Sequence, residues 1–590
     1  MSIPMISEAI IRHHANTQSF RRGEDYYNAK AVTALTQRKN LLWASVEGSS
    51  ASSYRVSIHF DAGGIAAACC TCPYDYDGWC KHIVATLLMC TRQPKAIESR
   101  PTLEQLLDRL DFVQTQRLVQ ALVAEQPELI NAVECHVSQL TSFVPQKQPP
   151  AVRRTTLDVA PFRRQIKQIL RDGIRELEYG YEEDPFTDDL QAVIEKAQEF
   201  TENGDGNSAI AILEAITAAY AEEWDELLDY GGDCYAITEY LDEAWTEAIL
   251  CADIPESQAV DLRVMLEVWQ DELDASFAMS LAALQQGWDY PPLQQVLEGK
   301  RLNESIWPGN RPTFADDLAL VRLKILSRQE RHQEYLFLAS AEGLAQQYLT
   351  RLAALGQVES ALAAAKTHMI TSEAALALAQ TLREGGHMTE GLEIASAGLA
   401  LPGNSRYDLA IWTSELAEAL GDRPVAFNAS IIAFTTRPSF QGYSQIEQLA
   451  GDNWSKVKQE LLQTLRAYRE WGSEDAKVNI FLHEGLLDEA IAVVNGAALY
   501  RSDLVHRVMD AAITHRADWV IERATRSAEE IVNAGKAERY EEAVKWLQKA
   551  RAAYLQSQRR SEWSIYRTNL TNTHARKRKL MELLKQGNIE

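Results

Sequence analysis

Three cysteines and one histidine in the first hundred residues form two close pairs. The pairs are Cys70 with Cys72 and Cys80 with His82, and one residue separates the members of each pair. A stretch rich in proline, aspartate and glycine joins the pairs and favours a chain reversal. Structural Zn²⁺ prefers four ligands in a closed tetrahedron, and three cysteines with one histidine are a standard set. The spacing therefore predicts one structural zinc ion held by these four residues.

Other uses of the thiols fit the pattern less well. A disulfide framework needs an oxidising compartment, whereas the cysteines outside residues 69–80 are single and dispersed, as in a reducing cytoplasm. Buried, unreactive thiols remain an alternative, because free cysteine packs as a small apolar side chain. Cys69 stands beside a ligand, but strand alternation points it away from the face of Cys70. We expect Cys69 to be a packed thiol that binds no metal.

The elements around these residues must bring the two pairs together. Residues 54–60 alternate between apolar and polar side chains, which is the period of a half-buried strand, and His59 falls on the polar face as a solvated residue. Residues after His82 carry apolar side chains at helical spacing. The pattern predicts helix within residues 6–30, then strands over 32–36, 41–47, 54–60 and 65–72, and a helix over about 81–90. We expect an antiparallel meander with that last helix packed on it.

The ligand pattern resembles the SWIM-type zinc finger, C-x-C-x(n)-C-x-H. Members commonly carry C-x-C-P before the loop and C-K-H with aliphatic residues after it; here these are Cys70-Thr71-Cys72-Pro73 and Cys80-Lys81-His82-Ile83-Val84-Ala85. Phe20-Arg21-Arg22-Gly23, followed by two tyrosines, resembles the opening of bacterial members. The resemblance covers the first hundred residues or so. It implies a finger that binds nucleic acid or protein and has no catalytic role.

The distribution of charge bears on what such a finger binds. The chain has a net charge of −24, which argues against a protein that coats nucleic acid with its whole surface. Residues 1–100, however, contain 11 Lys and Arg against 8 Asp and Glu. If the finger binds DNA, its phosphate contacts are expected from basic residues of this part, and binding should weaken with salt. The candidates are Arg21, Arg22, Arg38, Lys39, Arg55 and Lys81. For Lys81 the alternative is a solvated side chain that contacts no phosphate.

The rest of the chain has the pattern of an α-helical repeat. From residue 162 onward apolar residues keep helical spacing almost without a break. Several glycines are followed five residues later by a small residue, with a period near 33 residues, which resembles degenerate tetratricopeptide-like repeats. Stacked helix pairs of this kind form a solenoid that binds proteins or peptides. These glycines are Gly204, Gly356, Gly386, Gly421 and Gly485.

Three stretches of the helical part have unusual composition. Residues 176–189 and 220–247 combine acidic with aromatic side chains, which we interpret as a solvated face over a core stripe; a face that receives a basic partner is the alternative. Residues 559–579 are rich in arginine and lysine and end in a leucine-rich segment. We expect this segment to cap the helical array, and contact with nucleic acid is the alternative.

These observations predict a mainly α protein, with a small N-terminal α+β zinc-finger module followed by an α-helical repeat solenoid. The expected parts are a SWIM-type module over 1–95, a short helical segment over 96–143, a proline-rich linker over 144–161 and tetratricopeptide-like repeats over 162–590. The N-terminus lacks the pattern of a signal peptide and no apolar run is long enough to span a bilayer, so we expect a cytoplasmic location.

The function that we predict is a non-enzymatic, zinc-binding adaptor. Its finger binds DNA or another nucleic acid, or a protein, and its repeats recruit a protein partner. We find no phosphate-binding glycine loop, nucleophile–histidine constellation or dinucleotide fingerprint, so no catalytic residues are assigned. The alternative is a protein-interaction scaffold in which the finger is only structural and binds no nucleic acid.

Overall fold

The structure is a computed structural model of the 590-residue chain. It describes residues 8–48, 53–61, 63–74, 78–125, 159–178, 186–224, 227, 235–300, 305–307, 309–470, 472–496, 501–587 and 589. The chain divides into two compact units, Met1–Arg109 with Ala395–Glu590, and Leu110–Ile394. The expected linker over 144–161 lies almost wholly outside the described residues.

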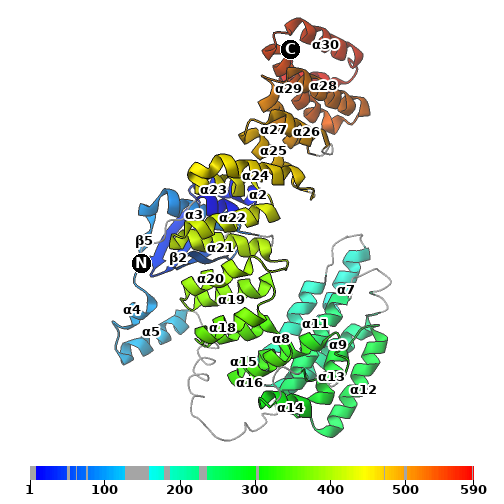
Figure 1. The fold of residues 1–590 in the computed structure, drawn as a ribbon. Helices are drawn as coiled ribbons and strands as arrows, with labels where there is room; N and C mark the ends of the chain where they lie inside the picture. The colour runs from blue at the N-terminus through cyan, green and yellow to red at the C-terminus, as the bar shows by residue number, and fades with distance from the viewer. Residues whose placement is uncertain are drawn as a thin grey trace. The chain divides into compact units, whose positions relative to one another are not determined.

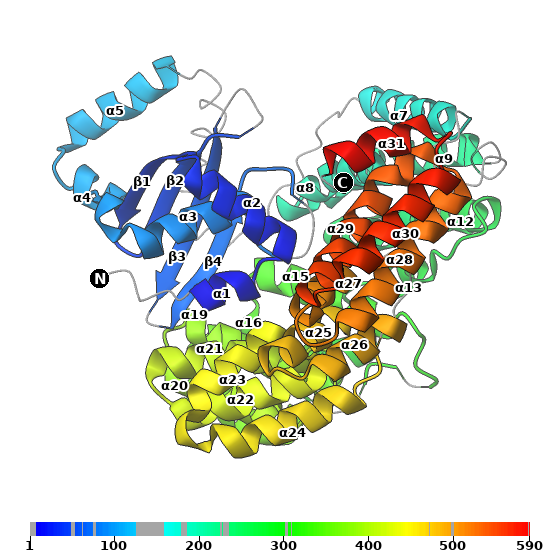
Figure 2. The same ribbon diagram turned by 90° about the horizontal axis from the view of Figure 1, so that it is seen from above.

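The N-terminal module of the first unit is a small sheet with helices on one face (Figures 1 and 2). Four strands form an antiparallel meander, and a short fifth strand pairs parallel to the first, giving the order β4-β3-β2-β1-β5. The elements in chain order are α1 (Glu8–His13), α2 (Thr17–Asn28), β1 (Val32–Arg38), β2 (Leu41–Val46), β3 (Tyr54–Asp61), β4 (Gly64–Cys70), α3 (Lys81–Arg92), η1 (Pro94–Ala96), β5 (Glu98–Ser99) and α4 (Leu103–Leu107). The expected meander and helix are confirmed.

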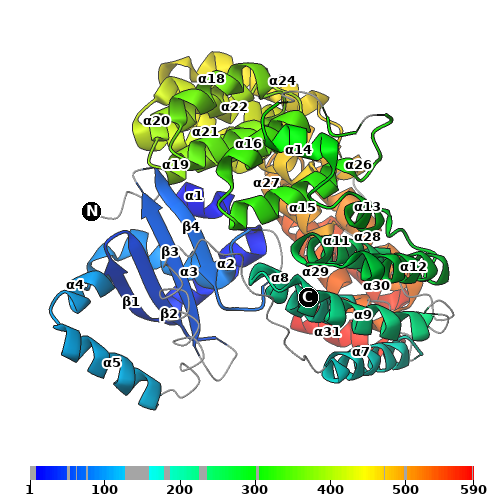
Figure 3. The ribbon, with the colours of Figure 1, turned by 90° about the horizontal axis from the view of Figure 1, so that it is seen from below.

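The core of this module lies between the sheet and α3. Strand residues with period 2, such as Val56 and Ile58, are fully buried against the apolar stripe of α3, which includes Val84 and Leu87. Helix α2 also packs closely on α3, where Gly23 leaves no room for a side chain: a Cβ there would lie 2.4 Å from Cγ1 of Val84. Among the residues of this module that the structure describes, no helix covers the opposite face of the sheet (Figure 3). One face of the sheet therefore packs on α3, and the other face, called the open face below, is uncovered by the described helices of this module.

The remainder of the first unit is an array of helices. Its members are α21 (Arg406–Leu420), α22 (Arg423–Thr436), α23 (Phe440–Ala450), η2 (Gly451–Asn453), α24 (Trp454–Ala467), α25 (Glu474–His483), α26 (Leu487–Gly496), α27 (Ser502–Ala512), α28 (Ala517–Ala534), η3 (Ala537–Arg539), α29 (Tyr540–Gln556), α30 (Arg560–Thr573) and α31 (Arg578–Gln586). The basic segment over 559–579 spans α30 and the start of α31, and α31 contacts α29 and buries Leu580 and Leu584. Lys577 just before it donates a hydrogen bond to the Val532 carbonyl. The capping role expected for this segment stays a prediction.

The second unit is entirely helical in its described part. Its helices are α5 (Phe112–Glu125), α7 (Ala160–Glu178), α8 (Thr187–Glu202), α9 (Gly206–Glu222), α11 (Tyr235–Cys251), α12 (Glu256–Glu272), α13 (Ala278–Gln286), α14 (Pro291–Leu297), α15 (Ala315–Arg328), α16 (His332–Ala341), α17 (Ala345–Ala354), α18 (Val358–His368) and α19 (Ser372–Glu384), and α20 (Met388–Gly398) crosses the boundary between units. Tyr220, Trp224 and Trp245 are buried, as expected for a core stripe. No described helix is long and apolar enough to cross a bilayer.

All five glycines of the repeat pattern lie between consecutive helices. Gly421, for example, ends α21 with φ 82°, a left-handed conformation that glycine adopts without a steric penalty. The small residue that follows at the fifth position is buried in each case, as at Ala426 and Ala490, which are fully buried. The glycines therefore mark helix turns, and the small residues permit close approach of neighbouring helices. Their assignment to tetratricopeptide-like repeats remains a prediction.

Candidate metal centre

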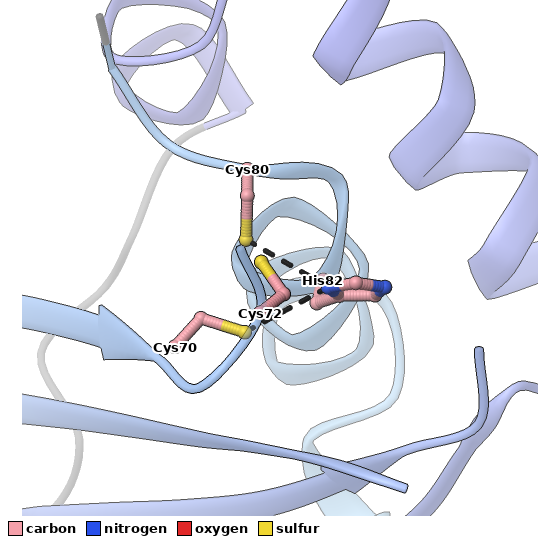
Figure 4. A group of neighbouring side chains, drawn as sticks. All are labelled: Cys70, Cys72, Cys80 and His82. Atoms are coloured by element: carbon pink, nitrogen blue, oxygen red, sulfur yellow. Dashed lines mark hydrogen bonds between the residues drawn. The ribbon is translucent and has the colours of Figure 1, made fainter. Parts of the chain in front are cut away.

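Two structural elements supply the four predicted ligands (Figure 4). Cys70 is the last residue of β4 and Cys72 follows it, while Cys80 is the N-cap of α3 and His82 lies in the first turn of that helix. The end of β4 and the start of α3 lie close together because both elements pack on the same hydrophobic core. The potential ligand atoms of all four residues lie within 4.8 Å of one another. The sequence prediction of the ligand set is therefore met by the geometry.

The distances between the ligand atoms match those of a zinc tetrahedron. Nδ1 of His82 lies 3.7 Å from Sγ of Cys70 and 3.9 Å from Sγ of Cys80. With Zn–S near 2.3 Å and Zn–N near 2.0–2.1 Å, a regular tetrahedron has S···N edges of about 3.6 Å. Three thiols and one imidazole are also the donor types that Zn²⁺ selects. The four residues therefore fit one zinc ion, with all four positions of the tetrahedron filled by protein.

The surroundings of Cys80 favour its thiolate, which is the form that binds metal. A hydrogen bond from the Cys70 thiol is the largest influence and lowers the pKa of Cys80 to about 4, against the opposing effect of burial. The backbone N–H of Ile83, at the positive end of α3, adds to this effect. The thiolate of Cys80 and burial in turn raise the pKa of Cys70 and Cys72. The cluster thus favours its first negative charge on Cys80, which disfavours ionisation of the other two thiols, and metal binding would release their protons.

The ring of His82 is fixed by aromatic neighbours. It stacks on Tyr54 with 4.4 Å between ring centroids and meets the edge of Tyr26 at 5.4 Å. Binding zinc through Nδ1 places the proton on Nε2, which is buried and has no hydrogen-bond partner in the described part of the chain. Gly48 lies close to both rings: a Cβ there would be 2.4 Å from Tyr54 and 3.5 Å from Nε2. Aromatic packing, rather than a hydrogen bond at Nε2, therefore orients the outer side of this ring.

A cavity of about 190 Å³ adjoins the ligands. Arg22 and Lys81, two of the predicted nucleic-acid contacts, line it together with Ser19, Tyr54 and Tyr74. The Lys81 ammonium lies 4.8 Å from the centre of the Tyr26 ring, which partly satisfies its charge. The metal centre therefore has a cationic border on the side of α2.

Comparison with known protein families identifies this module. Residues 54–90 match the family model of the SWIM zinc finger. The chain carries a SWIM zinc finger. The matched segment contains all four ligands, together with β3, β4 and nearly all of α3.

Known proteins with a similar segment support the same assignment. The chain is 30% identical over 118 residues to Zinc finger SWIM domain-containing protein 8 homolog of Drosophila melanogaster, covering 20% of this chain and 6% of that protein. It is 28% identical over 121 residues to Zinc finger SWIM domain-containing protein 8 of Homo sapiens, again 20% of this chain and 6% of the relative. The bovine protein of that name gives 28% over 121 residues, covering 8% of its length. The chain thus spans less than a tenth of these relatives.

The SWIM finger is tied to the helical array of its own unit through the residue before Cys80. The Trp79 ring stacks on the His14 ring with 4.5 Å between centroids, and the backbone N–H of Trp79 donates a hydrogen bond to the backbone carbonyl of His14 at 2.6 Å. Nε2 of His14 in turn lies 3.0 Å from the carboxylate of Glu415 in α21. Burial disfavours the charged imidazole, but the hydrogen bond and charge of Glu415 outweigh it and raise the pKa of His14. A chain of three side chains thus connects the metal loop with α21.

The predicted basic contacts divide between two sides of the SWIM finger. Arg21 and Arg22 are exposed on α2, and Arg22 lines the metal cavity. Arg55 is exposed on β3, and Lys39 is exposed in the turn between β1 and β2. Arg38 is half-buried and donates a hydrogen bond to the Pro101 carbonyl, so its guanidinium is partly occupied. The six residues do not form one patch.

Sequence reasoning missed an exposed tryptophan on the open face of the sheet. Trp43 of β2 is 41% exposed, while its neighbours Leu42 and Ala44 point to the other face of the sheet and are buried. Strand alternation and the polar partners of Trp43, Thr36 and Ser57, are the signals that identify its face. The same face corrects our expectation for Cys69: this thiol is exposed, because it pairs with Ser57 on the uncovered side of an edge strand.

A second group of potential ligands lies in the helical array but is already satisfied by protein partners. It comprises Glu447, His483 and Glu484. Glu484 accepts a hydrogen bond from the Tyr443 hydroxyl at 2.9 Å and pairs with the Lys458 ammonium at 2.8 Å. A cation would compete with that lysine, so we assign no metal here.

Proposed function

We propose that this protein is a non-enzymatic, cytoplasmic adaptor in which the SWIM finger binds nucleic acid and the helical region recruits a protein. The observation that carries the nucleic-acid part is the exposed Trp43 on the open face of the sheet. The dispersed single cysteines support a reducing compartment. The likeness of Phe20-Arg21-Arg22-Gly23 to bacterial members and the tetratricopeptide-like repeats belong to this proposal as well.

The open face has the composition of a platform for an unpaired base. Trp43 lies opposite Ser57 in the β2–β3 pair, and its diagonal neighbours on the same face are Arg55 and His59, which are both exposed. Diagonal neighbours of this kind lie about 7–8 Å apart, within reach of long side chains. Proteins that bind single strands stack bases on such aromatic rings while basic side chains follow the phosphates, and each stacked base contributes about 1–3 kcal/mol. We therefore favour single-stranded nucleic acid over a duplex.

The metal centre is joined to this platform by hydrogen bonds. The residue between Cys70 and Cys72 is Thr71, whose N–H donates to the Arg55 carbonyl at 3.0 Å, while the Arg55 N–H donates to Thr71 Oγ1 at 2.9 Å. The strand that presents Arg55 is thus hydrogen-bonded to the ligand loop. A closed Cys₃His site leaves no open position for a substrate, which is typical of structural rather than catalytic zinc. Zinc in this proposal holds the platform in shape.

The test is a binding titration with the full-length, zinc-loaded protein. Fluorescein-labelled 12-nucleotide single-stranded DNA, single-stranded RNA and a 12-base-pair duplex are followed by anisotropy at several salt concentrations between 50 and 300 mM. We expect binding of the single strands that weakens with salt, with Trp43→Ala reducing affinity by about 1–3 kcal/mol, or roughly 5- to 150-fold. Arg55→Ala should also flatten the salt dependence, because one phosphate contact is lost.

Matched controls separate the platform from general effects. Tyr240→Ala removes an aromatic ring of 40% exposure in the other unit, and it should leave binding unchanged. Binding that is equal in the wild type and Trp43→Ala refutes the platform. No binding of any of the three probes refutes the nucleic-acid role and leaves the alternative, a protein-interaction scaffold with a purely structural finger.

A further inference from the structure

The second unit contains an open groove between two neighbouring helices. Helices α9 and α12 contact each other and lie side by side in both views (Figures 1 and 3). The groove between them has a volume of about 650 Å³. Its apolar lining includes Ile210 on α9 and Ile254 and Met265 on the segment that contains α12, all of them half-buried. The groove therefore presents apolar surface to solvent between the two helices.

The charges around this groove are all negative. Glu214, Asp253 and Asp261 line it, each is exposed, and no lysine or arginine is part of the lining. None of the three carboxylates has an ion-pair partner among the residues that the structure describes. Three uncompensated carboxylates around an apolar floor favour a ligand that is both apolar and cationic.

A stripe of exposed valines continues this surface along α12. Val260, Val264 and Val268 are 59%, 53% and 46% exposed and recur every four residues, so they lie on one face of the helix. Asp261 is three residues from Val264 and four from Met265, and it therefore lies between the stripe and the groove. Valine is a weaker helix former than alanine or the long charged residues, so helix stability does not explain this choice at exposed positions. Contiguous exposed apolar residues with a polar rim are typical of an interaction surface.

We propose that the groove and the valine stripe, together the α9–α12 surface, bind a basic amphipathic helix of a partner protein. The inference rests on the proposed role of the helical region in recruiting a protein, and it specifies the chemistry of that partner. An amphipathic helix places its apolar face in a groove through residues at i, i+3, i+4 and i+7. Lysine or arginine beside that face then reaches Glu214 on one wall and Asp261 on the other. The 17 residues of α12 correspond to about 25 Å, enough for a partner helix of four to five turns.

The test uses a defined peptide and the full-length protein. The probe is a fluorescein-labelled 18-residue peptide of leucine and lysine, with the leucines on one helical face. Two further peptides separate the requirements: one has the same composition in scrambled order, and one has glutamate in place of lysine. We expect saturable binding of the amphipathic lysine peptide only, at one site per chain, measured by anisotropy.

Two charge-matched variants locate the binding site. Glu214→Lys with Asp261→Lys reverses two rim charges and should weaken binding by about tenfold or more. The control, Glu195→Lys with Glu199→Lys, reverses two exposed charges of α8 that do not line the groove and changes the net charge equally. It should leave affinity within about twofold of wild type. Val264→Glu serves as a second variant, because it changes an exposed residue without affecting the core.

The possible results are decisive. Equal weakening by both double variants would show a general attraction to an acidic protein and overturn the assignment, as would equal binding of the scrambled peptide or no binding at all. Nucleic-acid binding measured on the same variants should be unchanged. If the wild-type protein binds no nucleic acid, the platform of the SWIM finger is refuted and the α9–α12 surface is not affected. The two proposals therefore fail separately.

Discussion

Replacing Cys80 by serine tests the metal centre most sharply. Serine is a poor zinc ligand but a favourable N-cap, so Cys80→Ser removes a donor while it preserves the start of α3. Structural zinc contributes about 10–16 kcal/mol in small metal-dependent modules. Divided over four donors, each contributes roughly 3–4 kcal/mol, so zinc affinity should fall by about two to three orders of magnitude.

The assay combines metal content with local stability. After dialysis against a chelator, mass spectrometry should find one zinc per wild-type chain and almost none in Cys80→Ser. Hydrogen exchange should then accelerate in β4 and in the first turns of α3, because these two elements hold the ligands. Helices α28 and α29, which pack in a separate core cluster, should exchange as in the wild type.

The neighbouring thiol supplies the control. Cys69 is exposed and belongs to the open face of the sheet, so Cys69→Ser should retain one zinc per chain and wild-type exchange. One zinc per chain in Cys80→Ser would refute the ligand assignment. Loss of zinc in Cys69→Ser would show that a different set of thiols binds the metal.

Three further predictions concern the packing around the SWIM finger and in the second unit. Glu415→Gln and His14→Gln should be coupled by about 1 kcal/mol in a double-mutant cycle followed by hydrogen exchange of α1, a modest value because both side chains are partly exposed. Because the pKa of His14 is raised above its ordinary 6.5, the coupling is full below pH 6.5 and disappears as the pH rises through the folded-state value; coupling that grows with pH contradicts this. Gly23→Ala should destabilise the finger by about 1–3 kcal/mol in thermal unfolding, because overpacking against Val84 exceeds the gain of about 1 kcal/mol in helix propensity. Glu247 is fully buried and pairs with Lys324 and Arg328, whose side chains are partly exposed, so Glu247→Ala should cost about 1.5–3 kcal/mol in the second unit, whereas Glu239→Ala on the exposed face of α11 should cost little.

The metal centre and its supporting elements could be predicted because their signals are local. The period of residues 54–60 identifies β3, and the paired spacing identifies all four ligands. The buried small residues after the helix-ending glycines are equally local, since each belongs to one helix turn. Local signals extend over a few residues, so no knowledge of distant contacts is needed.

The features that sequence reasoning missed depend on distant contacts or on exposure. The pairing of His14 with Glu415 joins residues 401 positions apart, and no local pattern indicates it. Trp43 has the hydrophobicity of a core residue, and only the register of three strands shows that its face is uncovered. Cys69 lies on the same uncovered face, so the prediction that it is packed is wrong and the thiol is exposed. The α9–α12 surface likewise requires two helices that are not consecutive in the chain to be placed side by side.

The most direct test of the nucleic-acid role is to locate the contact by photocrosslinking. Single-stranded DNA with 5-bromodeoxyuridine at one position is irradiated with the full-length protein, and crosslinked peptides are identified by mass spectrometry. Crosslinks should concentrate at Trp43 in β2 and disappear in Trp43→Ala. Crosslinks confined to α2, beside Arg21 and Arg22, or no crosslinks at all, would contradict the assignment of the open face of the sheet as the binding platform.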